Sequence, residues 1–224
     1  TNRTDVVNPP VIANAGAIAT GDPDGDGDLD ILIMSWTDHN YLLRNDGNFQ
    51  FTDISQQAGL DLPGKSVGGA FGDLNGDDWV DLLIVTGGAD SSLSSDHLFF
   101  NDGQGNFLPS SQIAAFSLEE PGMQGMLQDF DLDGDLDLFV SQGHVLPQTD
   151  QIPTSPGWLQ PNKLFLNDGN DHFTDISENA GPGLKIKKSS RGAAYGDLDG
   201  DGDADIVINE IDDVPTILEN VGKP

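Results

Sequence analysis

The sequence contains no cysteine, few basic residues and no apolar run approaching the about 20 residues that span a bilayer. Without cysteine the chain has neither a disulfide framework nor thiolate chemistry. Only 9 basic residues stand against 38 acidic ones, and the formal net charge of −29 argues against binding to nucleic acid or anionic membranes. Helix signals are also nearly absent. Of the 224 residues, 36% are hydrophobic, which is enough to form a core.

One acidic stretch occurs four times, and the copies align without gaps. They read GDPDGDGDLDILI (21–33), GDLNGDDWVDLLI (72–84), QDFDLDGDLDLFV (128–140) and GDLDGDGDADIVI (196–208). Their first aspartates lie 51 to 68 residues apart. Repeats of about this length indicate a propeller or a solenoid, in which one supersecondary unit recurs.

Each repeat is predicted to form four short β-strands. Small residues such as GGAFG precede the acidic loop, and an apolar run follows it. A second repeated phrase comes next, as in YLLRNDGNFQFTDIS (41–55) and KLFLNDGNDHFTDIS (163–177), and its Asp-Gly pair between apolar runs is a strong hairpin signal. The sequence therefore predicts an all-β chain.

The acidic loops have the composition of metal sites. We count positions in each loop from its first aspartate. Acidic or amide side chains occupy positions one, three, five and nine, and position seven is expected to offer a backbone carbonyl. Calcium prefers six to eight hard oxygen ligands, which a flexible loop of this kind supplies. The predicted ligands are Asp22, Asp24, Asp26, Asp28 and Asp30; Asp73, Asn75, Asp77, Trp79 and Asp81; Asp129, Asp131, Asp133, Asp135 and Asp137; and Asp197, Asp199, Asp201, Asp203 and Asp205.

Two other interpretations of these loops are less favourable. An EF-hand ends with a glutamate at position twelve, where these loops have Ile33, Ile84, Val140 and Ile208. Magnesium gives up its waters reluctantly and fits less well. We therefore expect about four Ca²⁺ ions per chain, with loop two slightly different in geometry because Asp78 takes the usual glycine position.

These motifs resemble the FG-GAP/VCBS repeats of integrin alpha-subunit-like β-propellers. The resemblance covers almost the whole chain and implies a propeller with calcium in the loop between strands one and two of each blade. It leaves the function open, because such propellers occur in adhesion proteins, lectin-like proteins and non-catalytic parts of secreted enzymes.

The repeats predict one domain, residues 1–224, with four four-stranded blades. The expected blades are 15–55, 66–110, 122–177 and 190–222, the last completed by residues 3–7. RTDVV (3–7) aligns with FTDIS (51–55), so this N-terminal strand is expected to close the ring. The alternatives are part of a larger seven- or eight-bladed ring, or a half-ring completed by a second chain.

A ligand is expected on the side of the ring opposite the acidic loops. The loops there are unequal, and the longest, residues 141–162, departs most from the repeat. Aromatic and imidazole groups beside amides suit sugar or peptide recognition. The candidate ligand-binding residues are Trp36, His39, His144 and Trp158. For Trp158, packing of its own loop against the blades is an equal alternative.

We expect a secreted, extracellular or cell-surface, non-catalytic binding or adhesion module for glycan or protein. No common catalytic motif occurs in the sequence. Alternatives are a structural subunit of an extracellular assembly, with this chain itself as a partner, and an enzyme with its site at the ring axis. The chain begins without Met, as a mature or trimmed product would, and Asn2-Arg3-Thr4 is a glycosylation sequon.

Deletion of residues 1–8 tests the predicted closing strand. The truncated chain should lose stability and associate edge to edge, because the last blade would expose an unpaired strand, while its acidic loops stay intact. Thermal unfolding and sedimentation velocity measure both effects. A full-length monomer whose stability survives the deletion would exclude ring closure by this strand, and a full-length dimer would indicate a half-ring.

Overall fold

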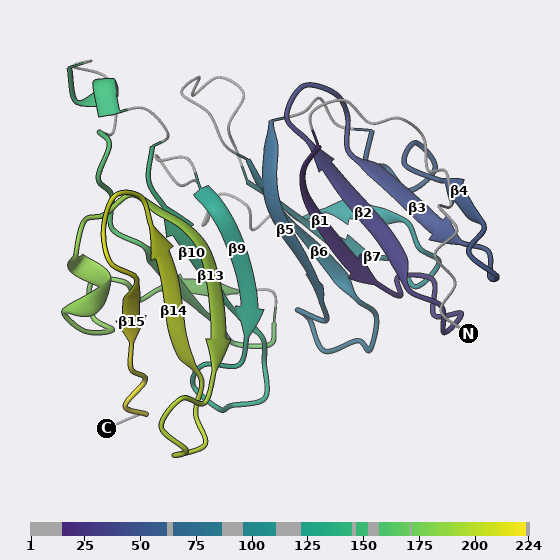
Figure 1. The fold of residues 1–224 in the computed structure, drawn as a ribbon. Helices are drawn as coiled ribbons and strands as arrows, with labels where there is room; N and C mark the ends of the chain where they lie inside the picture. Colours follow the sequence, from purple (N-terminus) through teal and green to yellow (C-terminus); the bar gives the residue numbers. More distant parts are fainter. Residues whose placement is uncertain are drawn as a thin grey trace, which may run out of the picture.

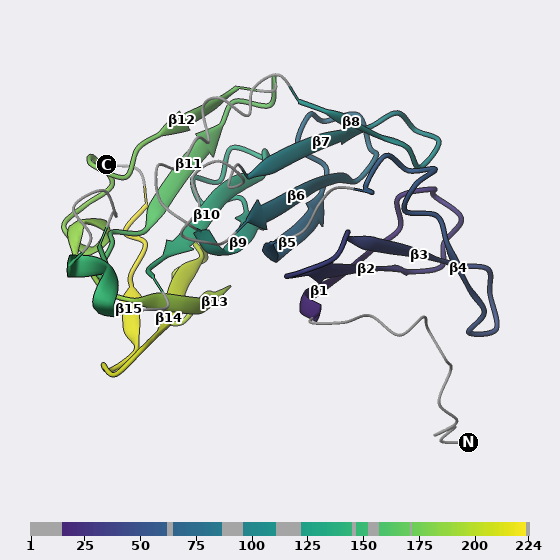
Figure 2. The same cartoon turned by 90° about the horizontal axis from the view of Figure 1, so that it is seen from above.

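The computed structural model describes residues 15–61, 65–86, 96–110, 122–144, 147–151, 157–170 and 172–222, and it is all-β apart from two short 3-10 helices. As predicted, the sheets are arranged as the four blades of a β-propeller (Figures 1 and 2). The strands are β1 (Ala15–Gly21), β2 (Asp30–Ser35), β3 (Tyr41–Asn45) and β4 (Phe51–Asp53); β5 (Ser66–Gly72), β6 (Asp81–Thr86), β7 (His97–Asn101) and β8 (Phe107–Pro109); β9 (Gly122–Gln128), β10 (Asp137–Gln142), β11 (Lys163–Asn167) and β12 (Phe173–Asp175); and β13 (Ser190–Gly196), β14 (Asp205–Glu210) and β15 (Thr216–Leu218). The 3-10 helices are η2 (Pro147–Gln151) and η3 (Gly183–Lys185).

Strands that follow one another in the chain are neighbours in each blade, and all pairs are antiparallel. Blades one to three have four strands each, and the described part of blade four has three, β13 to β15. The strand predicted to complete blade four, residues 3–7, lies outside the described residues.

Three apolar clusters hold the blades together face to face. Leu32 of blade one packs with Phe99 of blade two, Leu83 of blade two with Phe165 of blade three, and Phe139 of blade three with the apolar face of β14. Because β6 and β10 each contribute to two of these clusters, one on each face, their apolar residues run continuously instead of alternating. This explains the unbroken LLIV and DLFV segments.

The first strand of each blade lies on the inner side, and these strands pack in the order β1, β5, β9 and β13 (Figure 2). Their backbones come close together. A Cβ atom added at Gly68 would lie 3.0 Å from the Cα atom of Gln124 in β9, and one added at Gly16 would lie 2.7 Å from the carbonyl oxygen of Ser66. Glycine is therefore required at these two positions of β1 and β5 by the close approach of the neighbouring strand.

The blades follow an arc, with β1 at one end and β13 at the other (Figure 2). The innermost strands β1 and β13 do not pack against each other as the other successive pairs do. The described residues therefore leave the two ends of the arc without a mutual interface.

The connections divide into two sides of the molecule. The four acidic loops, between the first and second strands of the blades, lie on the lower side in Figure 1. The connections from β2 to β3 and from β14 to β15 lie on the upper side. This arrangement agrees with the prediction that the acidic loops and the connections between second and third strands occupy opposite sides.

Asp96 occupies an asparagine position of the repeat. In blades one and three, Asn40 and Asn162 precede the third strand, and their side-chain oxygens accept the N–H groups of Ser35 and Gln142. In blade two the carboxylate of Asp96 accepts the N–H of Thr86 at 2.8 Å. Burial raises the pKa of Asp96 to about 7, because the charged form loses its hydration.

Replacing Asp96 with asparagine should stabilise the protein at alkaline pH. A carboxyl whose pKa is raised on folding binds a proton more tightly in the folded state, so its contribution declines as the pH rises from about 4 through about 7. Asp96→Asn should raise the melting temperature by several degrees at pH 8, at roughly 2–4 °C per kcal/mol. Near pH 4 the two proteins should melt alike, and an equal difference at both pH values would contradict this account.

Candidate metal centres and the opposite face

The acidic loops are held in shape by hydrogen bonds from their own backbone to the first aspartate. The second carboxylate oxygen of Asp22 accepts the N–H of Gly27 at 2.9 Å. Asp129 and Asp197 accept the corresponding N–H groups of Gly134 and Gly202 at 3.0 and 3.2 Å. This arrangement wraps each loop around its carboxylates.

Three of the loops gather carboxylates closely enough to hold a metal ion. In each, one oxygen from each of three aspartates lies within 4.8 Å of the others. These groups are Asp22, Asp24 and Asp26; Asp129, Asp131 and Asp137; and Asp197, Asp199 and Asp205. Oδ2 of Asp30, the predicted ligand at position nine of loop one, is buried without a hydrogen-bond partner. Because a buried carboxylate oxygen without a partner is costly, this chemistry fits a cation bound to hard oxygens.

Loop two keeps the backbone shape but not the carboxylate group. Asp78 takes the position of Gly27, Gly134 and Gly202 with φ +70°, a left-handed conformation that aspartate adopts more readily than most residues. Its N–H donates to Asp73 at 2.9 Å, like the glycines of the other loops. Within the described ranges, loop two does not gather three carboxylates, and Asn75 stands at one of the ligand positions.

The ninth aspartate of each loop joins the loop to the rest of its blade. Asp81 accepts the N–H of Leu74 in its own loop at 2.9 Å and the N–H of Asn101 at the end of β7, also at 2.9 Å. Asp137 and Asp205 make the same pairs of bonds in blades three and four, and Asp30 makes the bond to the third strand. Their side chains are almost completely buried. Burial raises the pKa of Asp30, Asp81 and Asp137 to about 6.

An asparagine at the end of the third strand of the next blade fastens each of loops one, two and three. The side-chain amide of Asn101 in blade two donates to the carbonyl of Pro23 in loop one at 2.7 Å. Asn167 donates likewise to Leu74 at 2.9 Å, and Asn220 to Phe130 at 2.8 Å. The sequence did not predict this role. The equivalent asparagines are Asn45, Asn101, Asn167 and Asn220, and the first three belong to the repeated phrase NDG.

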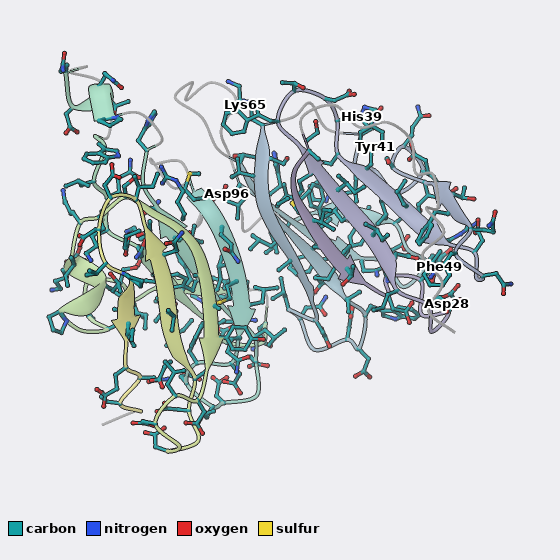
Figure 3. The ribbon with its side chains drawn as sticks, in the orientation of Figure 1. Asp28, His39, Tyr41, Phe49, Lys65 and Asp96 are labelled. Carbon is teal, nitrogen blue, oxygen red and sulfur yellow. The ribbon has the colours of Figure 1, made fainter. Side chains whose placement is uncertain are left out.

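On the opposite side, Trp36 and His39 lie together in the connection between β2 and β3. Trp36 is partly exposed, and the ring of His39 lies 4.2 Å from the ring of Tyr41. Figure 3 places His39 and Tyr41 on the side away from Asp28 of acidic loop one. Nδ1 of His39 contacts Asp38 at 3.0 Å, and the hydroxyl of Tyr41 donates to the same carboxylate at 2.9 Å.

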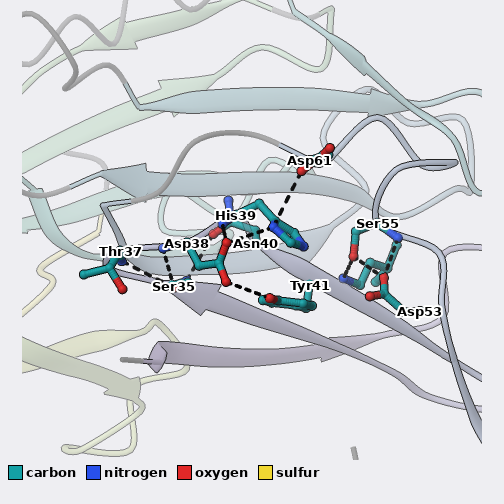
Figure 4. A network of polar contacts seen from close by, with 10 residues as sticks. Ser35, Thr37, Asp38, His39, Asn40, Tyr41, Asp53, Ser55 and Asp61 are labelled. Carbon is teal, nitrogen blue, oxygen red and sulfur yellow. Dashed lines mark hydrogen bonds and ion pairs between the residues drawn. The ribbon is translucent and has the colours of Figure 1, made fainter. Parts of the chain in front are cut away.

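A polar pocket of about 430 Å³ lies next to His39. It is lined by His39, Asp53, Ile54, Ser55, Gln56, Gln57 and Asp61. Figure 4 shows Asp61 on the far side of the imidazole from Tyr41, with Nδ1 3.7 Å from its carboxylate, and Asp53 bound to Ser55. No sequence signal predicted this pocket, because the segment 53–57 belongs to a repeated phrase whose main role is structural.

His144 and Trp158 are brought together, but within the fold. The N–H of His144 donates to the carbonyl of Trp158 at 3.1 Å, and His144 is buried. The N–H of Trp158 donates to Asp150 in η2 at 2.7 Å. Arg191, from the basic segment 185–191, donates to the carbonyls of Gly143 and His144. These contacts fix the backbone at both residues, and the indole Nε1 of Trp158 is buried. A ligand-binding role for either side chain stays a prediction.

The fold and the acidic loops define a β-propeller with candidate metal sites along one side. The family model described as "FG-GAP-like repeat" matches residues 22–84 and 143–208. The chain belongs to this family, as the repeated motifs indicated.

Two solved structures are similar to the chain, with low sequence identity and low TM-scores. The Photorhabdus luminescens Tc holotoxin pore matches with 18% identity and a TM-score of 0.45, over 89% of this chain and 9% of that chain. The V. cholerae biofilm matrix protein Bap1 matches with 16% identity and a TM-score of 0.43, over 95% of this chain and 38% of that one. This chain thus spans well under half of either. No curated protein sequence matches it.

In the part of the chain that the structure describes, no helix has the length and apolar character needed to cross a membrane.

Removing the first aspartate of loop four should remove one metal ion. Asp197→Ala deletes a ligand and also the acceptor of the N–H groups of Gly200 and Gly202, so the turn loses its support. Native mass spectrometry should show one divalent ion fewer per chain. Asp28→Ala is the matched control, because position seven of the loop is expected to offer only its carbonyl. An unchanged ion count in the Asp197 variant would exclude Asp197 as a ligand.

Proposed function

We propose that the chain is an extracellular, calcium-dependent and non-catalytic binding or adhesion module for a glycan or protein ligand. The observation that carries this proposal is the division of the molecule into two sides, with preformed acidic loops on one and an open polar pocket beside His39 on the other. Family membership supports the calcium part, and the pocket supports the binding part.

Calcium is the cation that these loops fit best. Each loop offers carboxylate or amide oxygens at positions one, three, five and nine, together with a backbone carbonyl, and it contributes no nitrogen or sulfur ligand. Oxygen donors in a flexible loop suit Ca²⁺, whereas Mg²⁺ requires stricter octahedral geometry and retains water. Half of the 38 acidic residues lie in these loops, so bound calcium would neutralise much of the net charge.

The groups that line the pocket suit the binding of a polar ligand rather than its hydrolysis. Gln56, Gln57 and the carboxylate of Asp61 supply hydrogen-bond donors and acceptors, and His39 supplies an imidazole. The hydroxyl of Ser55 is engaged with Asp53 at 2.5 Å and accepts the N–H of Leu42, so His39 does not activate it as a nucleophile. Sugar hydroxyls and peptide amides are the ligands that match such a lining.

Chelation tests the calcium part of the proposal. Without calcium the clustered carboxylates repel one another and the loops lose their shared centre. A ligand at 100 times its Kd stabilises by about 2.7 kcal/mol per site, or roughly 5–10 °C in melting temperature for a chain of this length. Melting should fall by at least this amount in excess EGTA and recover with Ca²⁺ but not with equal Mg²⁺. Equal melting with and without chelator would overturn the assignment.

Binding to a glycan array and to immobilised extracellular matrix proteins, with calcium present, tests the ligand part. His39→Ala and Asp61→Ala should each weaken binding about tenfold or more, the effect of losing a hydrogen bond to a charged group. His172→Ala is the control, because His172 is exposed and does not line the pocket. Undiminished binding by both pocket variants would exclude this pocket, and failure to bind either set of probes would contradict the proposal.

A further inference from the structure

Loops two, three and four share a hydrogen bond that loop one cannot form. In these three loops the backbone N–H at position two donates to Oδ2 of the aspartate at position nine, at 2.9, 2.8 and 2.9 Å. Oδ1 of the same carboxylate accepts a backbone N–H at the end of the third strand. Both oxygens of Asp81, Asp137 and Asp205 therefore have a partner within the chain.

In loop one, position two is Pro23, which has no N–H to donate. Oδ1 of Asp30 still accepts the N–H of Asn45 at 2.8 Å. Asp30 is 0% exposed, and within the part of the chain that the structure describes its Oδ2 has no hydrogen-bond partner. The proline thus leaves one carboxylate oxygen uncompensated inside the fold.

Two contacts from blade two hold loop one in this shape. The side-chain amide of Asn101 donates to the carbonyl of Pro23 at 2.7 Å. The indole of Trp79 covers Gly25 at position four, where an added Cβ atom would lie 2.8 Å from the ring. At the corresponding glycines of loops two and four, such an atom would meet nothing within 4 Å. These contacts oppose a shift of loop one that would bring another donor to Asp30.

A divalent cation is the partner that this oxygen lacks. Asp22, Asp24 and Asp26 of the same loop bring one oxygen each to within 4.8 Å of the others. Their charges also act on Asp30, whose pKa is raised first by burial and further by these carboxylates. A cation held by this group would compensate Oδ2 of Asp30, and calcium accepts such an oxygen as a ligand.

We propose that Pro23 makes loop one the tightest calcium site of the chain, an inference that rests on the calcium part of the proposed function. In loops two to four the N–H at position two stabilises the buried carboxylate with or without metal. In loop one the metal-free state has a buried oxygen without a partner, and calcium removes that penalty on binding. Pro23 does not contact the metal through its side chain and acts through Asp30.

Thermal unfolding of the wild-type chain and of Pro23→Leu, each with calcium and with excess EGTA, tests the proposal. Leucine supplies the N–H and keeps the carbonyl, as Leu74 does in loop two. The rise in melting temperature on adding calcium should be smaller in Pro23→Leu by roughly 3–5 °C, equivalent to tenfold weaker binding at one site. Comparing this rise cancels the change in unfolded-chain entropy that loss of a proline brings.

Two further variants separate the missing N–H from other effects of the substitution. Pro182→Leu is the matched control, because Pro182 is exposed and precedes η3, and its rise should equal that of the wild type. Leu198→Pro makes the opposite change in loop four. It removes the N–H that Asp205 accepts at 2.9 Å, at a position where loop one already has proline, and should enlarge the rise.

A calcium titration in competition with a chromophoric chelator tests the ranking of the sites. The tightest binding step of the wild type should be lost in Asp22→Ala, kept in Asp197→Ala and weakened about tenfold in Pro23→Leu, the effect of one hydrogen bond to a charged group.

The outcomes separate this inference from the proposed function. A wild-type chain that melts alike with and without calcium would overturn both. A wild-type chain that responds to calcium, with an equal response in Pro23→Leu or a tightest step that survives in Asp22→Ala, would overturn only the role of Pro23. An ordered water would then be the partner of Asp30.

Discussion

The buried aspartate at position nine of each acidic loop is the interaction on which the rest of this structure depends. In blades two to four its carboxylate accepts one backbone N–H from the loop and one from the end of the third strand. It thereby fixes the loop, the second strand and the third strand relative to each other. A carboxylate can do this for two donors at once while lending its remaining lone pairs to a cation. The cost is a buried charge, which in Asp81 and Asp137 appears as a raised pKa.

A bound cation would reduce the free-energy cost of burying the charged aspartate at position nine. The charged forms of Asp81 and Asp137 are disfavoured mainly by loss of hydration, and neighbouring loop carboxylates add to the effect. A bound divalent cation supplies compensating charge at the same place. Because the loop is fastened to the next blade by an asparagine, stiffening one loop also stiffens the interface beside it. The acidic side thus supports the scaffold on which the opposite side presents its pocket.

Departures from the repeat mark where individual blades differ. Asp96 replaces an asparagine with an acid and introduces a pH-dependent element into blade two. Asp78 replaces a glycine and keeps the left-handed backbone at some cost in conformational energy. In the extended connection after β10, Asp150 accepts the backbone N–H of Trp158 and Arg191 donates to the carbonyl of Gly143, so these contacts fix its backbone.

Much of the fold followed from the sequence because the repeat is strict. Four copies of a strand, an acidic loop and an apolar strand leave few architectures, and the Asp-Gly pairs predict the outer hairpins. The positions that could hold a cation were also readable, since alternate acidic residues in a turn must converge. The side of the molecule that carries the unequal loops followed from the same alternation of strands.

Sequence by itself determined the blades, their number and the candidate metal ligands, because these depend on residues close together in the chain. Only the tertiary structure showed that Asn101, Asn167 and Asn220 fasten each loop to the following blade, since those partners lie about 80 to 90 positions away. It also showed that His144 is buried while His39 borders a pocket, and that Leu198 and Ile217 are exposed. A residue's role in these cases depends on which blade lies beside it, and neighbouring blades are distant in sequence.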